Sequence, residues 1–157
     1  MTTTATATTA RDAAIEHFAA KLRYETDPSD VAAAQTAGDR FVLVDIRGHA
    51  AWHQGRAVGA IHLPTSEIVG RAASAISLDL PVVVYCWGPG CNGSTKAALQ
   101  FSRLGYEVRE LIGGFEYWAR EGLPVVDDIG PVLRTVDELT GPRASSSSGD
   151  GAIACDC

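Results

Sequence analysis

Two runs of consecutive apolar residues stand out along the chain, at 41–45 and 81–86. Runs of this length, rich in valine and bounded by turn residues, are typical of parallel strands buried on both faces of a sheet. We expect two further strands, a brief one at 60–62 and a longer one at 107–112. The pattern therefore predicts the strands of one mainly parallel sheet.

Apolar residues at helical spacing predict helices between and before these strands. The first helix is expected at 11–23, with Ile15, Phe18 and Leu22 on one face. Capping residues at helix starts and glycines after helix ends place the others at about 28–38, 49–54, 64–76, 94–104 and 114–121.

Two of these helices have a clear buried face in the sequence. The helix at 64–76 is expected to bury Ile68, Val69, Ala72, Ala73 and Ile76. Ser94 or Thr95 is expected to cap the helix at 94–104. The apolar face of that helix consists of Ala97, Ala98, Phe101 and Leu104.

Strands that alternate with helices imply parallel strand–helix–strand units. The predicted fold class is therefore α/β, a doubly wound, mainly parallel sheet with helices on both faces. We expect an N-terminal helical segment at 11–40 packed on the domain, a core at 41–126 and a C-terminal extension at 127–140. A disordered lead at 1–10 and a disordered Gly/Ser-rich tail at 141–157 complete the chain.

Composition places the chain among ordinary soluble proteins, since 46% of its 157 residues are hydrophobic and 20% are charged. The net charge is -6 without a Lys/Arg cluster, which argues against nucleic acid or a membrane as a partner. With no apolar run of bilayer length and no secretory signal, we expect a cytoplasmic protein. Thiols stay reduced there unless they are catalytic or redox-active, so four cysteines in two close pairs suggest chemistry.

The strongest signal is the loop that follows the strand at 81–86. It begins at Cys86 and continues through Trp87, Gly88, Pro89, Gly90, Cys91, Asn92, Gly93 and Ser94. A cysteine at the carboxyl end of a parallel strand lies where α/β proteins bind ligands, and the next helix directs its N–H groups at the loop. This setting favours a thiolate and makes Cys86 the candidate nucleophile. The alternative is an inert buried cysteine beside an anion-binding loop.

Several short motifs carry a resemblance to a known family, in the same order along the chain. They are Val44-Asp-Ile-Arg47, Trp52-His-Gln-Gly55, Gly59-Ala-Ile-His-Leu-Pro64, Val83-Val-Tyr-Cys86, Ser94-Thr-Lys-Ala-Ala98, Leu104-Gly-Tyr106 and Leu111-Ile-Gly-Gly-Phe-Glu-Tyr-Trp118. Together they resemble the rhodanese homology family over about residues 41–126. The resemblance implies a single-domain rhodanese-like sulfurtransferase with a doubly wound parallel sheet.

The resemblance also implies a chemistry and partners. In this family a cysteine takes sulfane sulfur from a donor, becomes a persulfide, and passes the sulfur to a nucleophile in a ping-pong cycle. By this resemblance Cys86 is the nucleophile and requires no cofactor. The donor is thiosulfate or a persulfide, and the acceptor is a thiol or cyanide, with a protein acceptor of sulfur also compatible.

The loop departs from the family's Cys-x-x-x-x-Arg-Ser pattern. Two more residues precede Ser94, and Gly93 stands in place of the arginine. Residues 86–93 carry no charged side chain, so backbone amides alone would hold an anionic donor. This disfavours a phosphatase or arsenate reductase, and makes a neutral or thiol-bound persulfide as suitable a donor as thiosulfate.

Two residues near Cys86 have two interpretations each. Cys91 is either a resolving thiol for an oxidised Cys86 or a small side chain that fills the base of the loop. Arg47 either contacts the substrate or forms a structural ion pair with Asp45 or Glu67, and we favour the ion pair.

Other candidates are less specific. Trp87 either lines a pocket or packs in the core or an interface. Cys155 and Cys157 have three interpretations: carrier thiols that reach Cys86, weak metal ligands together with Cys86 and Cys91, or incidental residues of the tail. No metal site is expected, because no ligand spacing connects His49, His53 and His62.

Two functions of different classes compete. The leading one is a persulfide-forming sulfurtransferase. The other is a non-catalytic rhodanese-like module that binds a partner or senses redox state through Cys86 and Cys91. An intact nucleophile in a glycine-rich cradle favours the enzyme, whereas the lone domain and the uncharged loop fit the module.

Overall fold

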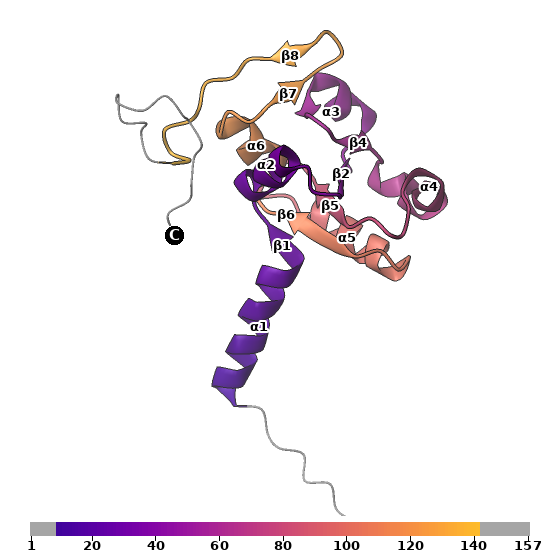
Figure 1. The fold of residues 1–157 in the computed structure, drawn as a ribbon, viewed down its shortest axis with the longest axis vertical. Helices are drawn as coiled ribbons and strands as arrows, with labels where there is room; N and C mark the ends of the chain where they lie inside the picture. The colour runs from indigo at the N-terminus through magenta and orange to yellow at the C-terminus, as the bar shows by residue number, and fades with distance from the viewer. Residues whose placement is uncertain (1–8, 142–157) are drawn as a thin grey trace, which may run out of the picture.

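The computed structural model describes residues 9–141, and its centre is a five-stranded sheet (Figure 1). The strand order is β1-β6-β5-β2-β4, and all four neighbouring pairs are parallel. These strands are β1 (Glu25–Thr26), β6 (Val108–Leu111), β5 (Val82–Tyr85), β2 (Val42–Asp45) and β4 (Ile61–His62). The expected parallel sheet is confirmed, and its central strand β5 is the one that leads into Cys86.

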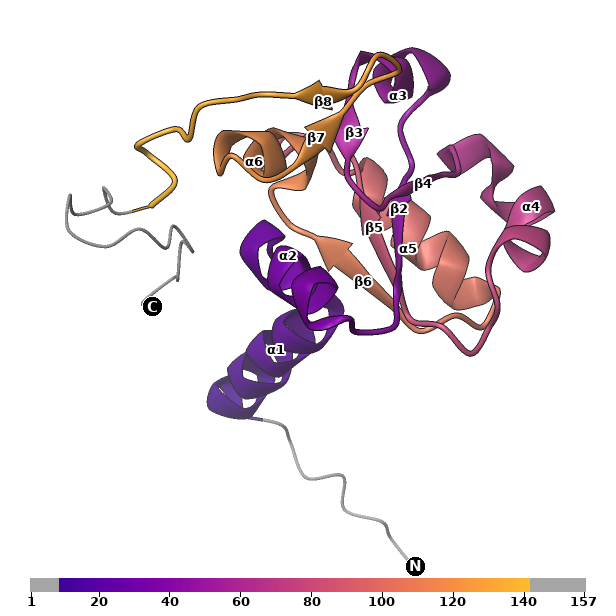
Figure 2. The ribbon, with the colours of Figure 1, turned by 45° about the horizontal axis from the view of Figure 1, so that its top comes forward.

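Helices cover both faces of this sheet, as Figure 2 shows. One face packs against α4 (Ile68–Ala75) and α5 (Gly93–Arg103), and the other against α2 (Pro28–Ala37) and α6 (Gly114–Arg120). The short α3 (His49–Gln54) and the 3-10 helix η1 (Thr65–Glu67) flank β4. Each face has its own apolar cluster, because successive residues of a buried strand point to opposite sides. The predicted doubly wound α/β class is thus confirmed.

The first helix, α1 (Ala10–Tyr24), does not pack as expected. It projects away from the sheet (Figure 1), and none of its residues is buried. The face formed by Ile15, Phe18 and Leu22 is exposed to solvent. Local interactions hold the helix instead: a capping box between Thr9 and Asp12 at its start, and an ion pair after its last turn. Of the segment 11–40, the part that packs on the domain is β1 and α2.

The buried faces of α4 and α5 are narrower than expected. Ile68, Ala72 and Ile76 are buried, but Val69 is 71% exposed and Ala73 also faces solvent. In α5, Ala97 and Phe101 are buried while Leu104 lies at the exposed end. A single row of apolar residues along the helix is enough where the helix contacts one sheet face only.

A second, small sheet was not predicted. It consists of β3 (Arg56–Ala57), β7 (Val125–Val126) and β8 (Pro131–Val132), paired antiparallel. It ties the extension at 127–140 to the core, because β8 pairs with β7. The expected disordered lead at 1–10 lies outside the described residues up to residue 8, and Ala10 is the first residue of α1. The expected disordered tail at 141–157, with Cys155 and Cys157, lies outside them from residue 142 on. Among the helices of residues 9–141, none has the length and apolar character of a membrane span.

Candidate active site

Cys86 follows β5 directly, at the carboxyl end of the middle strand of the sheet. The start of α6 fixes its backbone: the Phe115 N–H donates to the Cys86 carbonyl at 2.9 Å, and the Glu116 N–H donates to that of Trp87 at 2.7 Å. Gly114 permits this close approach, since it has φ +58° and a Cβ there would lie 2.7 Å from the Cys86 carbonyl oxygen. The Gly-Gly pair of the closing motif thus positions the cysteine.

The loop brings Cys86 and Cys91 together. A turn, in which the Cys91 N–H donates to the Gly88 carbonyl at 3.0 Å, returns the chain toward the strand end. The two Sγ atoms are 2.9 Å apart. Gly93 leaves room for them, because a Cβ at this position would lie 2.7 Å from the Cys86 Sγ and 3.3 Å from the Cys91 Sγ.

The pKa shifts of the two thiols differ from the shift that we expected for Cys86 from the sequence. Burial, and next the hydrogen bond with Cys91, raise the pKa of the Cys86 thiol to about 11. The hydrogen bond from Cys86 and the Gly93 N–H lower the pKa of the Cys91 thiol. Desolvation of the 7% exposed Cys86 outweighs the helix N-terminus that was expected to favour its thiolate. Burial thus keeps Cys86 a thiol, and of the two sulfurs Cys91 is the one whose surroundings favour a thiolate.

The helix after the loop begins differently from the prediction. It starts at Gly93, and its N-cap residue Asn92 makes no side-chain capping bond. The Ser94 and Thr95 hydroxyls donate to the Glu110 carboxylate on β6 instead, at 2.7 and 3.0 Å. These residues anchor the first turn of α5 to the neighbouring strand rather than cap it, which fixes the helix N-terminus beside the two thiols.

Arg47 lies beneath the loop and is buried. Its guanidinium forms a short pair with the Asp45 carboxylate at 2.6 Å and donates to the Gly55 carbonyl, also at 2.6 Å. It also stacks under the rings of Trp87 and Phe115, 4.5 and 4.1 Å from their centroids. The ion-pair partner of Arg47 is thus Asp45 and not Glu67.

The sequence did not single out Tyr85 as part of this network. Its hydroxyl donates to the Asp45 carboxylate at 2.7 Å and accepts the Ala57 N–H at 3.2 Å. Burial and the Asp45 charge raise the pKa of Tyr85, so it stays a phenol. The sequence signal that could have identified Tyr85 was its position directly before Cys86, at the end of a fully buried strand.

Trp87 lines a cavity of about 810 Å³ that does not include the thiols. The cavity lies between α6 and residues 133–137 of the extension, and Phe115, Glu116, Arg120 and Arg134 are among its lining residues. Cys86 and Cys91 are not among them. Cys86 belongs to the apolar cluster on the α4 and α5 face, whereas Phe115 belongs to the opposite one. The Trp87 side chain is therefore a pocket wall on the opposite face of the sheet from the two thiols.

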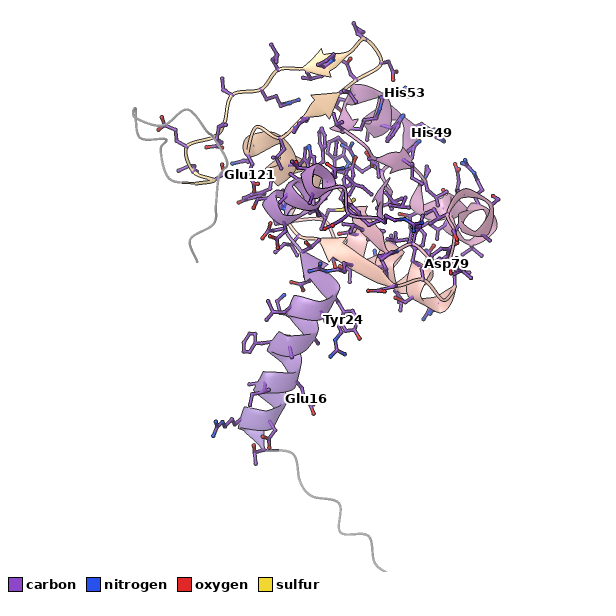
Figure 3. The ribbon with its side chains drawn as sticks, viewed as in Figure 1. Glu16, Tyr24, His49, His53, Asp79 and Glu121 are labelled. Carbon is purple, nitrogen blue, oxygen red and sulfur yellow. The ribbon has the colours of Figure 1, made fainter. Side chains whose placement is uncertain are left out.

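The histidines have separate roles in the structure. His49 pairs with Glu67 at 3.3 Å and His53 with Asp128 at 2.6 Å (both histidines are labelled in Figure 3). His62 bonds the Arg47 carbonyl at 2.8 Å. Within residues 9–141 there is no group of three or more His, Cys, Asp or Glu side chains arranged to hold a metal ion.

The part of the chain that contains this site is similar to known proteins. A family model described as a rhodanese-like domain matches residues 27–121. The thiosulfate sulfurtransferase GlpE of Actinobacillus succinogenes is 39% identical over 88 residues, which are 55% of this chain and 77% of GlpE. The crystal structure of the BH2092 protein from Bacillus halodurans superimposes with a TM-score of 0.71 at 38% identity, covering 76% of this chain and 88% of that one.

A further relative has a different architecture. The HTH-type transcriptional regulator Rv0324 of Mycobacterium tuberculosis is 37% identical over 90 residues. The match takes in 57% of this chain but 39% of the regulator. The chain thus spans about two-fifths of the length of that relative.

Proposed function

This chain belongs to the rhodanese-like domain family, and we propose that it is a sulfurtransferase that carries sulfane sulfur as a persulfide of Cys86. The observation that carries the proposal is the place of Cys86, at the end of the central strand and against Gly93, the first residue of α5. Family membership and the similarity to GlpE support the same class of reaction.

The proposed cycle has two displacements at one sulfur atom. The Cys86 sulfur attacks the sulfane sulfur of the donor, and the donor's remaining part leaves as sulfite or a thiolate with the electron pair. An acceptor thiol or cyanide then attacks the outer sulfur of the persulfide and releases Cys86. Each step exchanges one bond to sulfur for another, so the cycle needs no further oxidant or reductant.

The charges around the loop favour a donor other than a dianion. Residues 86–93 contain no cation, and Arg120, the cation near Gly88, is paired with the Glu116 carboxylate. Arg47 is already paired with Asp45. An uncharged or thiol-bound persulfide therefore suits this site better than thiosulfate, the donor in GlpE's name.

Redox sensing is the second candidate function, and one observation favours it. The two Sγ atoms lie 2.9 Å apart, close enough for a disulfide to form if the loop adjusts. Mild peroxide would oxidise one thiol to a sulfenic acid, and the other would displace water from it. The cycle of such a switch needs an oxidant and a reducing thiol but no sulfur donor.

Intact mass after incubation with a donor tests the proposal. The wild-type protein should gain one sulfur atom from an organic persulfide and return it to cyanide as thiocyanate. Cys86→Ser should lower the thiocyanate rate at least about 100-fold, because the nucleophile is gone, while its circular dichroism stays native. If the wild type takes no sulfur from either donor but forms a reversible Cys86–Cys91 disulfide with peroxide, redox sensing replaces the transferase.

A further inference from the structure

The two loop thiols differ in how far an acceptor molecule can reach them. Cys86 is 7% exposed and belongs to the apolar cluster under α4 and α5. Cys91 is only half-buried, yet its Sγ is 2.9 Å from that of Cys86. A thiol on a peptide or protein therefore meets Cys91 before Cys86.

We propose that Cys91 is a second sulfur carrier, which takes the sulfane sulfur from Cys86 and delivers it to acceptor thiols. The proposal rests on the Cys86 persulfide of the proposed function and adds the route by which the sulfur leaves. It gives Cys91 a catalytic role in place of the resolving or space-filling role considered from the sequence.

The surroundings of Cys91 suit it to the release step. The Gly93 N–H at the start of α5 donates to its Sγ at 3.4 Å, and the Lys96 charge lies in the same first turn. The pKa of Cys91 is lowered first by the hydrogen bond with Cys86, then by the Gly93 N–H and least by Lys96, whereas burial raises the pKa of Cys86. Because a thiol of lower pKa is the better leaving group, an acceptor displaces Cys91 from the outer sulfur more readily than Cys86.

The relay step balances without a further reagent. The Cys91 thiolate attacks the outer sulfur of the Cys86 persulfide and forms a new S–S bond. The bond between that sulfur and the Cys86 Sγ breaks, its electron pair stays on Cys86, and the persulfide proton returns to Cys86. The charge is then on the Cys91 persulfide, and the total number of S–S bonds is unchanged.

The test compares acceptors of different size. Wild type, Cys91→Ser and Cys91→Ala are loaded with an organic persulfide, alkylated and mapped by peptide fragmentation, and their transfer rates to glutathione and to cyanide are measured. In the wild type the sulfur should be found on both Cys86 and Cys91. In both variants it should stay on Cys86, and the ratio of the glutathione rate to the cyanide rate should fall about tenfold. Unchanged melting temperatures control for folding.

Both results are required, and the absence of either overturns the relay. Sulfur loaded onto Cys91 in Cys86→Ser would reverse the order of the two carriers and overturn it too. So would a Cys86–Cys91 disulfide with release of hydrogen sulfide, since Cys91 would then attack the inner sulfur. A wild-type protein that takes up no sulfur at all is distinguishable from these, because it contradicts the proposed function itself.

Discussion

The sulfurs of Cys86 and Cys91 meet because residue 93 has no side chain. A Cβ on Gly93 would lie 2.7 Å from the Cys86 Sγ, closer than two non-bonded atoms can approach. The φ angle of Gly93 is one that alanine readily adopts, because it lies outside the positive range. Substitution there thus perturbs the thiols without straining the backbone.

We expect Gly93→Ala to slow sulfur uptake by about 10- to 100-fold, because a displacement of the reacting atoms by about 1 Å has effects of this size. The fold should be kept, since alanine is the better helix former. Uptake is followed by intact mass. Gly90→Ala is the matched control and should slow uptake far less, because a Cβ on Gly90 meets no atom within 4 Å. Equal rates for the two variants would contradict the role given to Gly93.

Sequence reasoning at the residue scale singled out Cys86 as the candidate nucleophile but expected a lowered pKa where burial raises it. Cys86 was identifiable from the strand, loop and helix around it. Its raised pKa depends on burial among residues of α4 and α5 far along the chain, which the loop sequence does not reveal. The contact with Cys91 stayed open for a similar reason, since a spacing of five residues does not determine where two side chains point.

At the scale of elements, the long strands and the helices were predictable, whereas β4 was the only two-residue strand within residues 9–141 that was predicted. β2 and β5 have enough consecutive apolar residues to be recognised, and Gly38 and Gly105 end helices in the expected left-handed conformation. The two-residue strands β1, β3, β7 and β8 have no periodicity to read, because partners far along the chain create them.

A buried carboxyl group where α6 meets α2 predicts that the stability of the fold depends on pH. Glu121 (labelled in Figure 3) ends α6, and its buried Oε2 has no hydrogen-bond partner in the described part of the chain. Burial, and next the Asp27 charge at the start of α2, raise the pKa of Glu121 from 4.5 to about 7. Between these values the folded protein holds a proton that the unfolded chain has lost. The stability contributed by Glu121 is therefore complete below about pH 4.5 and is lost as the pH rises through 7.

Glu121→Gln, which stays neutral, should match the wild type near pH 4.5 and exceed its free energy of unfolding at pH 8. The expected gain is about 1 kcal/mol, after allowance for solvent screening of a half-buried group. Urea denaturation at several pH values measures it. Parallel stability curves for the two proteins would show that Glu121 does not hold its proton in the folded state.

For the molecule as a whole, the sequence predicted the layers of the fold but not the placing of α1. Alternating strands and helices permit few other arrangements, so the doubly wound sheet followed from the pattern. Ile15, Phe18 and Leu22 have the spacing of a buried face, yet they are exposed. Periodicity identifies which residues share a face, but only the complete structure shows whether another element covers it.

The overall charge of the molecule leads to a prediction about the donor. The chain carries a net charge of -6, so a dianion such as thiosulfate is repelled while an uncharged organic persulfide is not. Near the site, Arg120 offsets Glu116 and Asp45 offsets Arg47, so neither pair attracts the dianion. Raising sodium chloride from about 10 to about 200 mM shortens the Debye length from about 30 Å to less than 10 Å. The value of kcat/KM for thiosulfate should then rise a few-fold, and that for the uncharged donor should stay constant. A fall in the thiosulfate value with added salt would instead mean that local cations, Lys96 foremost, attract the donor and outweigh the charge of the whole molecule.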